Sequence, residues 1–197
     1  MSRSYHPIAF TESVQDAQER YGSRSAIDRT DRHLPLGAAG DPLSDDEREF
    51  IAERDGFYLA TVSESGWPYV QFRGGPPGFV TCPDEHTVAW ADFRGNRQYI
   101  STGNVAHDPR VSIIFMDYAR QQRLKVFGVA TIGDVPRRPP YAGPLAVPDY
   151  QAIVEREVRI EVKAFDWNCP QHITPRFTVE ELRRRVAWLS EPPAPPA

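Results

Sequence analysis

Basic and amide side chains gather in short segments of this 197-residue chain that are suited to binding an anion. Arg73 precedes a run of glycine and proline over residues 74–78, and glycines allow a backbone to approach a ligand closely. Residues 92–98 read Asp-Phe-Arg-Gly-Asn-Arg-Gln, between a predicted strand and a predicted helix. Free backbone N–H groups at a helix start, together with the Arg97 guanidinium, are placed to bind a phosphate.

Two further cations lie on one predicted strand. Arg123 and Lys125 are two residues apart, so their side chains point to one face of that strand while Leu124 and Val126 point to the other. Each cation taken singly is as consistent with an ordinary solvated charge that has a carboxylate partner. Taken together with the glycine-rich segment, the cations favour a site for an anionic ligand.

A third concentration of polar chemistry, Asp-Trp-Asn-Cys-Pro-Gln-His, occupies residues 166–172. Trp167 can stack on a planar ligand and Asn168 can hydrogen-bond to it, which predicts that this segment lines the substrate side of a site. The alternative is a turn in which Trp167 caps the core, because Asn and Pro are turn residues. Catalysis by Cys169 is the weaker interpretation, since only His172 is close enough in sequence to activate its thiol.

Common catalytic signatures are absent from the sequence, among them the Walker phosphate loop, Gly-x-Gly-x-x-Gly, His-Glu-x-x-His and Gly-x-Ser-x-Gly. The five histidines are scattered, without the spacing of paired metal ligands on a helix, so no metal site is predicted. Cys82 and Cys169 are far apart, and both are expected to be reduced thiols.

The composition is that of a soluble globular protein, with 40% hydrophobic residues, 25% charged residues and a net charge of -4. A net negative chain lacks the basic field that nucleic-acid binding requires, so no nucleic-acid partner is predicted. No apolar run approaches the length that spans a bilayer, and the start of the chain lacks the apolar segment of a secretory signal. The sequence therefore predicts a cytoplasmic protein without a membrane partner.

Strand-forming residues recur in seven segments, which turn formers such as Ser65-Gly66 and Pro83-Asp84 separate. The clearest alternation places Val158, Ile160 and Val162 between charged residues, which is typical of a strand with one buried and one solvated face. The spacing predicts a mostly β (α+β) fold, an antiparallel barrel of six to seven strands with flanking helices. The predicted strands are residues 57–62, 69–73, 79–81, 87–91, 111–116, 124–132 and 158–165.

Helices are predicted at residues 11–21, after Ser44, at 96–106 and at 178–189. Ser44 with Glu47, and Thr178 with Glu181, have the spacing of a capping box. Residues 136–148 are dense in Pro and Gly, which predicts an irregular excursion over the surface. These patterns divide the chain into an N-terminal arm over 1–43 that packs on the barrel or on a partner, a domain over 44–190, and a disordered Pro-rich tail over 191–197.

Four segments together resemble a known family: residues 55–62, 66–76, 92–99 and 123–128. They resemble the pyridoxamine 5'-phosphate oxidase-like, FMN-binding split-barrel proteins, and most closely the branch of predicted flavin-nucleotide-binding proteins. The most specific part is Arg-Gly-Gly-Pro, at 73–76, in combination with Gly-Asn-Arg-Gln, at 95–98. The resemblance implies a split β-barrel, FMN as the cofactor, and a homodimer with the flavin at its interface.

The same resemblance implies roles for individual residues. It places Gln71 and Arg73 on a strand beside the flavin, and it departs from the family at Pro68 and Asn96, where the oxidase has arginines. The C-terminal Arg-Leu-His-Asp-Arg of the oxidase has no counterpart here, so oxidation of vitamin B6 is not predicted. The implied cofactor-binding residues are Gln71 at the flavin edge, Trp90 and Ala91 on the ring side, Asn96 and Arg97 at the phosphate, Arg73, Arg123 and Lys125 at the phosphate and the ring, and Trp167 and Asn168 in the loop beyond.

The predicted function is that of an FMN-dependent oxidoreductase that acts on an unidentified small molecule, with no catalytic acid or base identified. A non-catalytic protein that binds a flavin nucleotide remains the alternative, because a fold does not fix a function. A deazaflavin on the same barrel is a second possibility. Haem is a third, and it would require His107 or His172 as an axial ligand.

Overall fold

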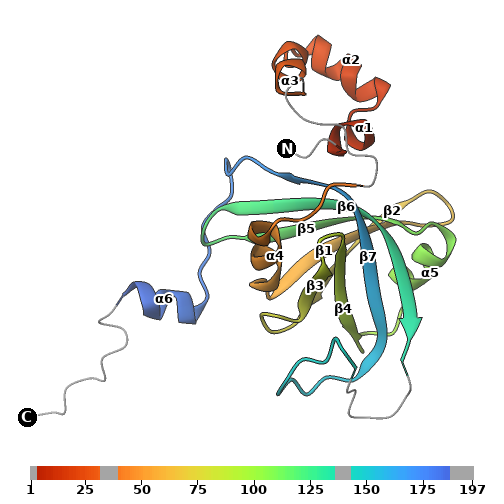
Figure 1. Ribbon diagram of the computed structural model, residues 1–197, viewed down its shortest axis with the longest axis vertical. Helices are drawn as coiled ribbons and strands as arrows, with labels where there is room; N and C mark the ends of the chain where they lie inside the picture. The colour runs from red at the N-terminus through yellow and green to blue at the C-terminus, as the bar shows by residue number, and fades with distance from the viewer. Residues whose placement is uncertain (1–3, 32–39, 136–142, 187–197) are drawn as a thin grey trace, which may run out of the picture.

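Seven antiparallel strands form one strongly curved sheet in the computed structural model, which describes residues 4–31, 40–135 and 143–186 (Figure 1). The order across the sheet is β2-β1-β5-β6-β7-β4-β3. All seven predicted strands are present, most of them longer than predicted. They are β1 (Gly56–Val62), β2 (Pro68–Gly74), β3 (Val80–Asp84), β4 (Thr87–Phe93), β5 (Arg110–Asp117), β6 (Gln122–Asp134) and β7 (Val154–Trp167).

Alternation along the strands sends apolar side chains into the barrel and polar ones outward. In β7, Val158, Ile160 and Val162 are buried while Arg159 and Glu161 between them are exposed, as the sequence predicted. The sheet does not close, because its edge strands β2 and β3 are not paired with each other. The fold is therefore the predicted split barrel, with a gap between β2 on one side and β3 and β4 on the other.

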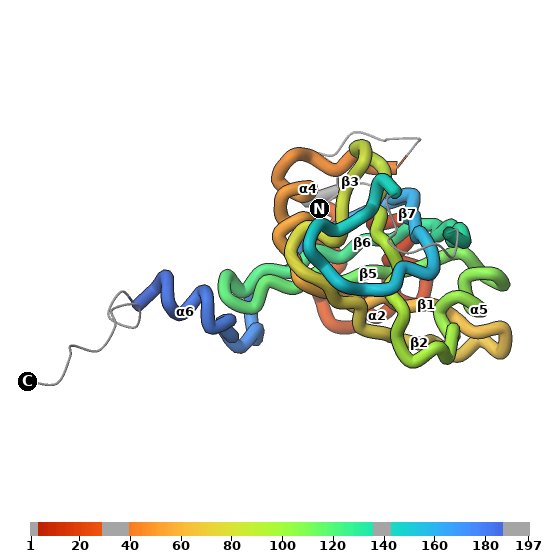
Figure 2. Tube along the Cα trace, turned by 90° about the horizontal axis from the view of Figure 1, so that it is seen from below, coloured from red at the N-terminus to blue at the C-terminus, as the bar shows by residue number. Residues whose placement is uncertain are grey.

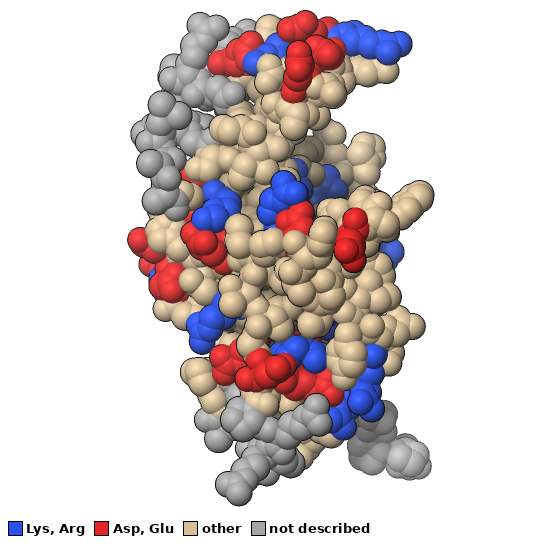
Figure 3. Space-filling model, turned by 90° about the vertical axis from the view of Figure 1, so that its right-hand side faces the viewer, with Lys and Arg blue, Asp and Glu red and all other residues tan. Residues whose placement is uncertain are grey.

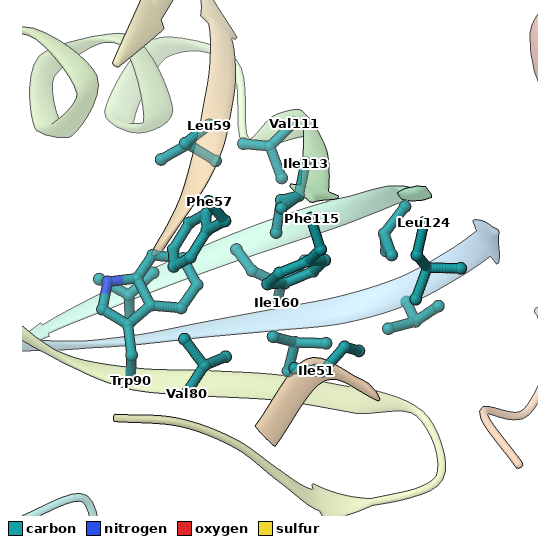
Figure 4. Close-up of a cluster of buried hydrophobic side chains, with 14 of the residues drawn as sticks. Ile51, Phe57, Leu59, Val80, Trp90, Val111, Ile113, Phe115, Leu124 and Ile160 are labelled. Atoms are coloured by element: carbon teal, nitrogen blue, oxygen red, sulfur yellow. The ribbon is translucent and has the colours of Figure 1, made fainter. Parts of the chain in front are cut away.

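The core fills the barrel with aromatic and branched side chains from every strand except β2 (Figure 4). At its centre the ring of Phe57 contacts three other rings: Phe79 at 5.9 Å, Trp90 at 4.9 Å and Phe115 at 5.2 Å between centroids. Ile51, from a helix at one end of the barrel, completes the cluster. This core connects β1 and β5 to β3 and β4 across the barrel, where no hydrogen-bond ladder joins them directly.

Helices surround the barrel on several sides (Figures 1 and 2). The N-terminal helices lie above it, α4 covers one end, α5 lies beside the β1–β2 hairpin, and α6 projects away from the body in both views. None of the described helices has the length and apolar composition to cross a membrane. The helices are α1 (Tyr5–Ala9), α2 (Glu12–Arg20), α3 (Arg24–Asp31), α4 (Asp45–Ala52), α5 (Ile100–His107) and α6 (Val179–Arg185).

Both predicted capping boxes are present. At the start of α4, the Glu47 carboxylate accepts the Ser44 N–H at 2.9 Å. At the start of α6, the Glu181 N–H donates to the Thr178 hydroxyl at 3.2 Å, and the Glu181 carboxylate accepts the Thr178 N–H at 2.7 Å. The later part of the predicted helix over 178–189, and the predicted tail over 191–197, lie outside the described residues from 187 on.

Two local predictions need correction, and the structure adds two helices. The helix predicted from Asn96 begins at Ile100, because Arg97 and Tyr99 have left-handed backbones. The predicted turn at Pro83-Asp84 lies two residues later, at Glu85-His86. The proline can stay in the strand because β3 is an edge strand with a register shift, where a proline removes no required hydrogen bond. Helices α1 and α3 were not predicted: each is short, and α1 is held by tertiary contacts such as the stacking of Tyr5 on Phe127 at 5.1 Å.

Candidate functional site

A buried carboxylate bridges the gap between the two sides of the barrel. Asp92 of β4 is 3% exposed and accepts hydrogen bonds from Arg156 of β7 at 2.9 and 2.7 Å. Its other oxygen lies 3.0 Å from Nη1 of Arg73 on β2. Arg73 pairs with Phe57, whose side chain points into the barrel. Asp92 lies two residues from Trp90, which also points inward, and it pairs with Arg156. All three side chains therefore point to the inner side of the sheet. This ion-pair bridge spans the split where no strand pairing does.

A second carboxylate extends this network to the surface. Glu155 accepts a hydrogen bond from Arg94 Nε at 2.8 Å and lies 3.2 Å from Arg156. The hydrogen bond from Arg94, with the positive charge of Arg156, holds the pKa of Glu155 below its usual value. The Tyr99 hydroxyl donates to Glu155 at 3.3 Å and accepts from Arg97 Nε at 3.2 Å. We name this network the split cluster: Arg73, Asp92, Arg94, Arg97, Tyr99, Glu155 and Arg156.

Charges of both signs within the cluster explain why it can be partly buried. Burial of Arg156 disfavours its charge, but the hydrogen bonds and charge of Asp92 outweigh that effect and raise its pKa above the usual value. The four arginines still outnumber the two carboxylates by two. Figure 3 shows a similar mixture of acidic and basic side chains toward the lower end of one face of the molecule. The split cluster therefore carries an excess of positive charge.

The loop between β4 and α5 has an unusual backbone. Arg97 and Tyr99 both have left-handed backbones, with φ of 61° and 55°. The Asn96 side chain accepts the Gln98 N–H at 3.1 Å, which forms a local turn instead of the first turn of a helix. The helix therefore begins at Ile100, and Tyr99, at its N-cap, supplies no side-chain hydrogen bond to the first turn. The leading N–H groups of α5 are left without an intrahelical acceptor.

Gln71, a predicted cofactor-binding residue, lies on the same inner side of β2 as Arg73. Its Oε1 accepts a hydrogen bond from the Ser101 hydroxyl of α5 at 2.9 Å. One turn further along, Asn104 Nδ2 donates to the Thr61 hydroxyl of β1 at 2.9 Å. These two bonds fix α5 against the β1–β2 hairpin. The structure thus brings together four of the ten predicted residues: Gln71, Arg73, Asn96 and Arg97.

Trp90 and Ala91 neighbour this group in sequence, but their side chains are buried. Trp90 is 1% exposed and its indole lies inside the core against Phe57, with its N–H unbonded to any described residue (Figure 4). Ala91 points to the other face of β4, where it packs with Leu145 in a small apolar cluster. The sequence did not show that β4 would be covered on both faces.

The two cations of β6 lie elsewhere. Lys125 donates to the Tyr5 hydroxyl at 2.7 Å, lies 3.6 Å from Asp166 and sits 4.8 Å from the centre of the Tyr5 ring. Arg123 donates to the Cys169 carbonyl at 3.2 Å. They share a face of β6, as predicted, but it is the outer face, three strands away from β2. One subunit therefore does not place them beside Arg73.

Trp167 lies at the α4 end of the barrel. Its indole N–H donates to Glu47 at 2.6 Å and its ring meets Phe50 edge-on at 4.7 Å, which is the core-capping arrangement left open by the sequence. Asn168 donates its backbone N–H to the Arg123 carbonyl at 3.1 Å. Beside them is a cavity of about 460 Å³, lined by Asp46, Glu47, Glu49, Phe50, Glu53, Arg120, Gln122 and Trp167.

Two glycines after Arg73 have packing roles that the sequence interpretation did not foresee. A Cβ at Gly74 would lie 2.8 Å from the Phe72 ring, and one at Gly75 would lie 2.6 Å from the Phe79 ring. These glycines make room for the protein's own aromatic rings, so their presence is not by itself a sign of a ligand. The two histidines considered for haem, His107 and His172, are both exposed. No group of three or more metal-binding side chains occurs within the three described segments.

Sequence reasoning missed Tyr99, Glu155 and Arg156. The last two belong to a run of charged residues, Glu155-Arg156-Glu157, that precedes the predicted start of the strand at Val158. Arg156 and Glu157 pair with both β4 and β6, and Val154 pairs with β4, so β7 extends back to Val154. One feature of the sequence could have indicated Arg156. A carboxylate within an apolar strand, such as Asp92, requires a cationic partner from a neighbouring strand.

Comparison with solved structures reveals the same fold at low sequence identity. HupZ of Group A Streptococcus superposes with a TM-score of 0.50 at 16% identity, over 68% of this chain and 100% of that one. An FMN-binding protein from Syntrophomonas wolfei subsp. wolfei gives a TM-score of 0.44 at 11% identity, over 77% of this chain and 97% of that one. At 16% identity the similarity to HupZ concerns the fold alone.

Comparison at the level of sequence families is more specific. No curated protein matches the chain. The family described as "Pyridoxamine 5'-phosphate oxidase" matches residues 43–160, which run from just before α4 into β7 and include all of the split cluster. That match covers more than half of the 197 residues, and the chain therefore belongs to the pyridoxamine 5'-phosphate oxidase family.

Proposed function

We propose that this protein is an FMN-binding oxidoreductase that acts on a small molecule, and that it works as a homodimer with the flavin at the subunit interface. The observation that carries the proposal is the split cluster, an arginine-rich network beside the start of α5 in a chain of this family. A bound FMN would supply the hydride or electron transfer, for which these side chains contain no redox group of their own.

The residues of the split cluster fit a phosphate. A phosphate monoester carries a charge of about -2 at neutral pH, which matches the excess of two arginines over carboxylates in the cluster. Arg73 Nε is buried and makes no hydrogen bond to a described residue, so one donor of the cluster has unused capacity. Arg97 is exposed, and its only described hydrogen bond leaves most of its donors open to solvent.

Each residue has a distinct part in the proposed site. Arg97, Asn96 and the leading N–H groups of α5 bind the phosphate, because a helix N-terminus and a guanidinium both favour a negative charge. Gln71 reaches the edge of the flavin, held in place by Ser101. The proposed residues fix and orient the cofactor, and nothing in the cluster is assigned as a general acid or base.

A homodimer would bring together the predicted cofactor-binding residues that lie far apart within one subunit. Arg123 and Lys125 are on the outer face of the sheet, whereas the split cluster is on the inner side, so a single subunit cannot place both around one ligand. The outer face of β1 and β2 is also unusually apolar for a surface, with Val70 60% and Phe72 58% exposed beside Tyr58. We propose that a second copy of the chain covers this face.

Replacing Val70 with aspartate is expected to convert the dimer into monomers, because a carboxylate would then have to be desolvated in an apolar interface. Sedimentation velocity of the purified protein measures this directly. Val179→Asp is the matched control, since Val179 is as exposed as Val70 but lies on α6, away from the β1–β2 face. A wild-type protein that sediments as a monomer, or a Val70→Asp protein that stays dimeric, contradicts this interface.

The visible spectrum of the purified protein, followed by release and identification of its chromophore, tests the cofactor. We expect FMN, and we expect Arg97→Ala to weaken FMN binding by about ten- to hundredfold with little effect on riboflavin, which lacks the phosphate. Arg183→Ala is the matched control, because Arg183 is also an exposed arginine but lies on α6. Binding is measured by the quenching of flavin fluorescence on titration.

Other outcomes of the same experiment point to the alternatives. A deazaflavin or haem spectrum would replace FMN as the cofactor. Bound FMN that no donor reduces faster than free FMN would indicate a flavin-binding protein without catalysis. Unchanged FMN affinity in Arg97→Ala would remove Arg97 from the phosphate site.

A further inference from the structure

Arg73 and Arg97, the two arginines of the split cluster that have donors available to the proposed phosphate, are connected by an unbroken chain of contacts. Arg97 donates to the Tyr99 hydroxyl, the Tyr99 ring lies 4.9 Å beneath the Arg156 guanidinium, and Arg156 binds Asp92 at 2.7 Å. Asp92 in turn binds Arg73 at 3.0 Å. Three residues outside the predicted site, Tyr99, Arg156 and Asp92, thus lie between the two arginines.

The backbone of the loop shows that this chain of contacts carries strain. A left-handed conformation is unfavourable for a residue with a side chain, and the loop has two such residues within three positions, Arg97 and Tyr99. Such conformations persist only where surrounding contacts determine them. The Tyr99 side chain has two such contacts, the stacking against Arg156 and the hydrogen bond to Glu155 at 3.3 Å.

The chain of contacts has a largely buried part, Asp92 and Arg156, and a solvent-exposed end, Arg97. Asp92 and Arg156 are held inside by paired charge, and Arg156 donates to both Asp92 and Glu155. Arg97, at the other end, is exposed and connected to the buried part only through Tyr99 among the described residues. The position of the Arg97 guanidinium therefore depends on the Tyr99 hydroxyl.

We propose that Tyr99, Arg156 and Asp92 are positioning residues that hold Arg97 and Arg73 in the arrangement that receives a phosphate. This inference rests on the proposed function for the identity of the ligand, an FMN phosphate. The ring and the hydroxyl of Tyr99 have different roles, since the ring anchors the loop on Arg156, whereas the hydroxyl orients Arg97 and adds only an exposed hydrogen bond to Glu155. Preorganisation of this kind lowers the ordering cost that binding would otherwise incur.

Tyr99→Phe separates these two roles, because phenylalanine retains the ring over Arg156 and removes only the hydroxyl. We expect FMN to bind about five- to tenfold more weakly, through the loss of one oriented hydrogen bond to a charged group, while riboflavin affinity and the melting temperature stay the same. In an Arg97→Ala background, Tyr99→Phe should have no further effect on FMN, because Tyr99 acts through Arg97.

Tyr150→Phe is the matched control, since Tyr150 contacts Phe93 at the same end of the barrel and its hydroxyl bonds to no described residue. A Tyr99→Phe protein that binds FMN as tightly as wild type, or that loses FMN and riboflavin affinity equally, overturns the inference while leaving the proposed function intact. Additive effects of Tyr99→Phe and Arg97→Ala overturn it as well. A wild-type protein that binds neither FMN nor inorganic phosphate overturns both the inference and the proposed function.

Discussion

Replacing Asp92 with alanine is expected to lower the free energy of unfolding by about 3–5 kcal/mol, the range for removing one partner of a buried ion pair. Asp92 is the shared acceptor of Arg73 and Arg156, whose side chains are 20% and 12% exposed. Without the carboxylate, two guanidinium groups would face each other inside the barrel with little water to screen them. Equilibrium unfolding in urea measures the loss.

The position of Asp92 makes the effect larger than that of an ordinary ion pair. The edge strands β2 and β3 are not joined by backbone hydrogen bonds, so the Arg73–Asp92 contact is one of the connections that hold the barrel together across its split. Asp92→Asn retains the shape and one acceptor oxygen, and it should fall between wild type and Asp92→Ala.

Asp108→Ala is the control for this prediction. Asp108 also binds an arginine, Arg110, and its pKa is lowered to about 2 by that hydrogen bond, but the pair is at the surface. Solvent screens such a pair, and its removal should leave the urea midpoint unchanged within error. Equal midpoints for Asp92→Ala and Asp108→Ala would show that the bridge across the split contributes no more than a surface pair.

Sequence reasoning predicted the strands well because their pattern is local. Val158, Ile160 and Val162 alternate with charged residues, and that alternation alone identifies a strand and its buried face. The same reasoning failed at residues 155–157, where three consecutive charges gave no alternation. The strand β7 includes those residues because Arg156 and Glu157 pair with β4 and β6, which a single segment of sequence does not reveal.

The site was predictable in part. Arg73 and Arg97 were identified from their setting and from the family resemblance, and the structure places both in one network. Arg123 and Lys125 were correctly assigned to one face of a strand, but alternation cannot say whether that face is inside or outside a barrel. That depends on how the sheet curves, and the structure places both cations outside, with Lys125 beneath Tyr5 of the N-terminal arm.

The start of α5 shows the same limit on a smaller scale. Residues 96–106 contain no proline and a single glycine, Gly103, so a start at Asn96 was a reasonable prediction. Tyr99 takes a left-handed backbone because its ring and hydroxyl are held by Arg156 and Glu155, which come from a strand 56 residues later. Contacts between distant segments thus determine the backbone conformation of the loop that we propose as the phosphate site.

Phe57→Ala is expected to be the most destabilising change in the core, with a loss of about 3–5 kcal/mol in the free energy of unfolding. Phe57 is 1% exposed, and its ring contacts Phe79, Trp90 and Phe115, which come from both sides of the barrel (Figure 4). Removing the ring leaves a cavity at a place where side-chain packing, rather than strand pairing, holds β1 against β4. The measurement is again urea unfolding.

Phe177→Ala provides the matched control, because Phe177 contacts Arg185 of α6 outside the barrel and its loss should cost less than about 1 kcal/mol. Phe57 also lies close to both partners of the ion pair. It pairs directly with Arg73 on β2, and its ring contacts Trp90 on β4, the strand that bears Asp92. If packing at Phe57 and the ion pair at Asp92 close the split together, the double variant should lose less than the sum of the two single losses. Strictly additive losses would show that the core and the ion-pair bridge close the barrel independently.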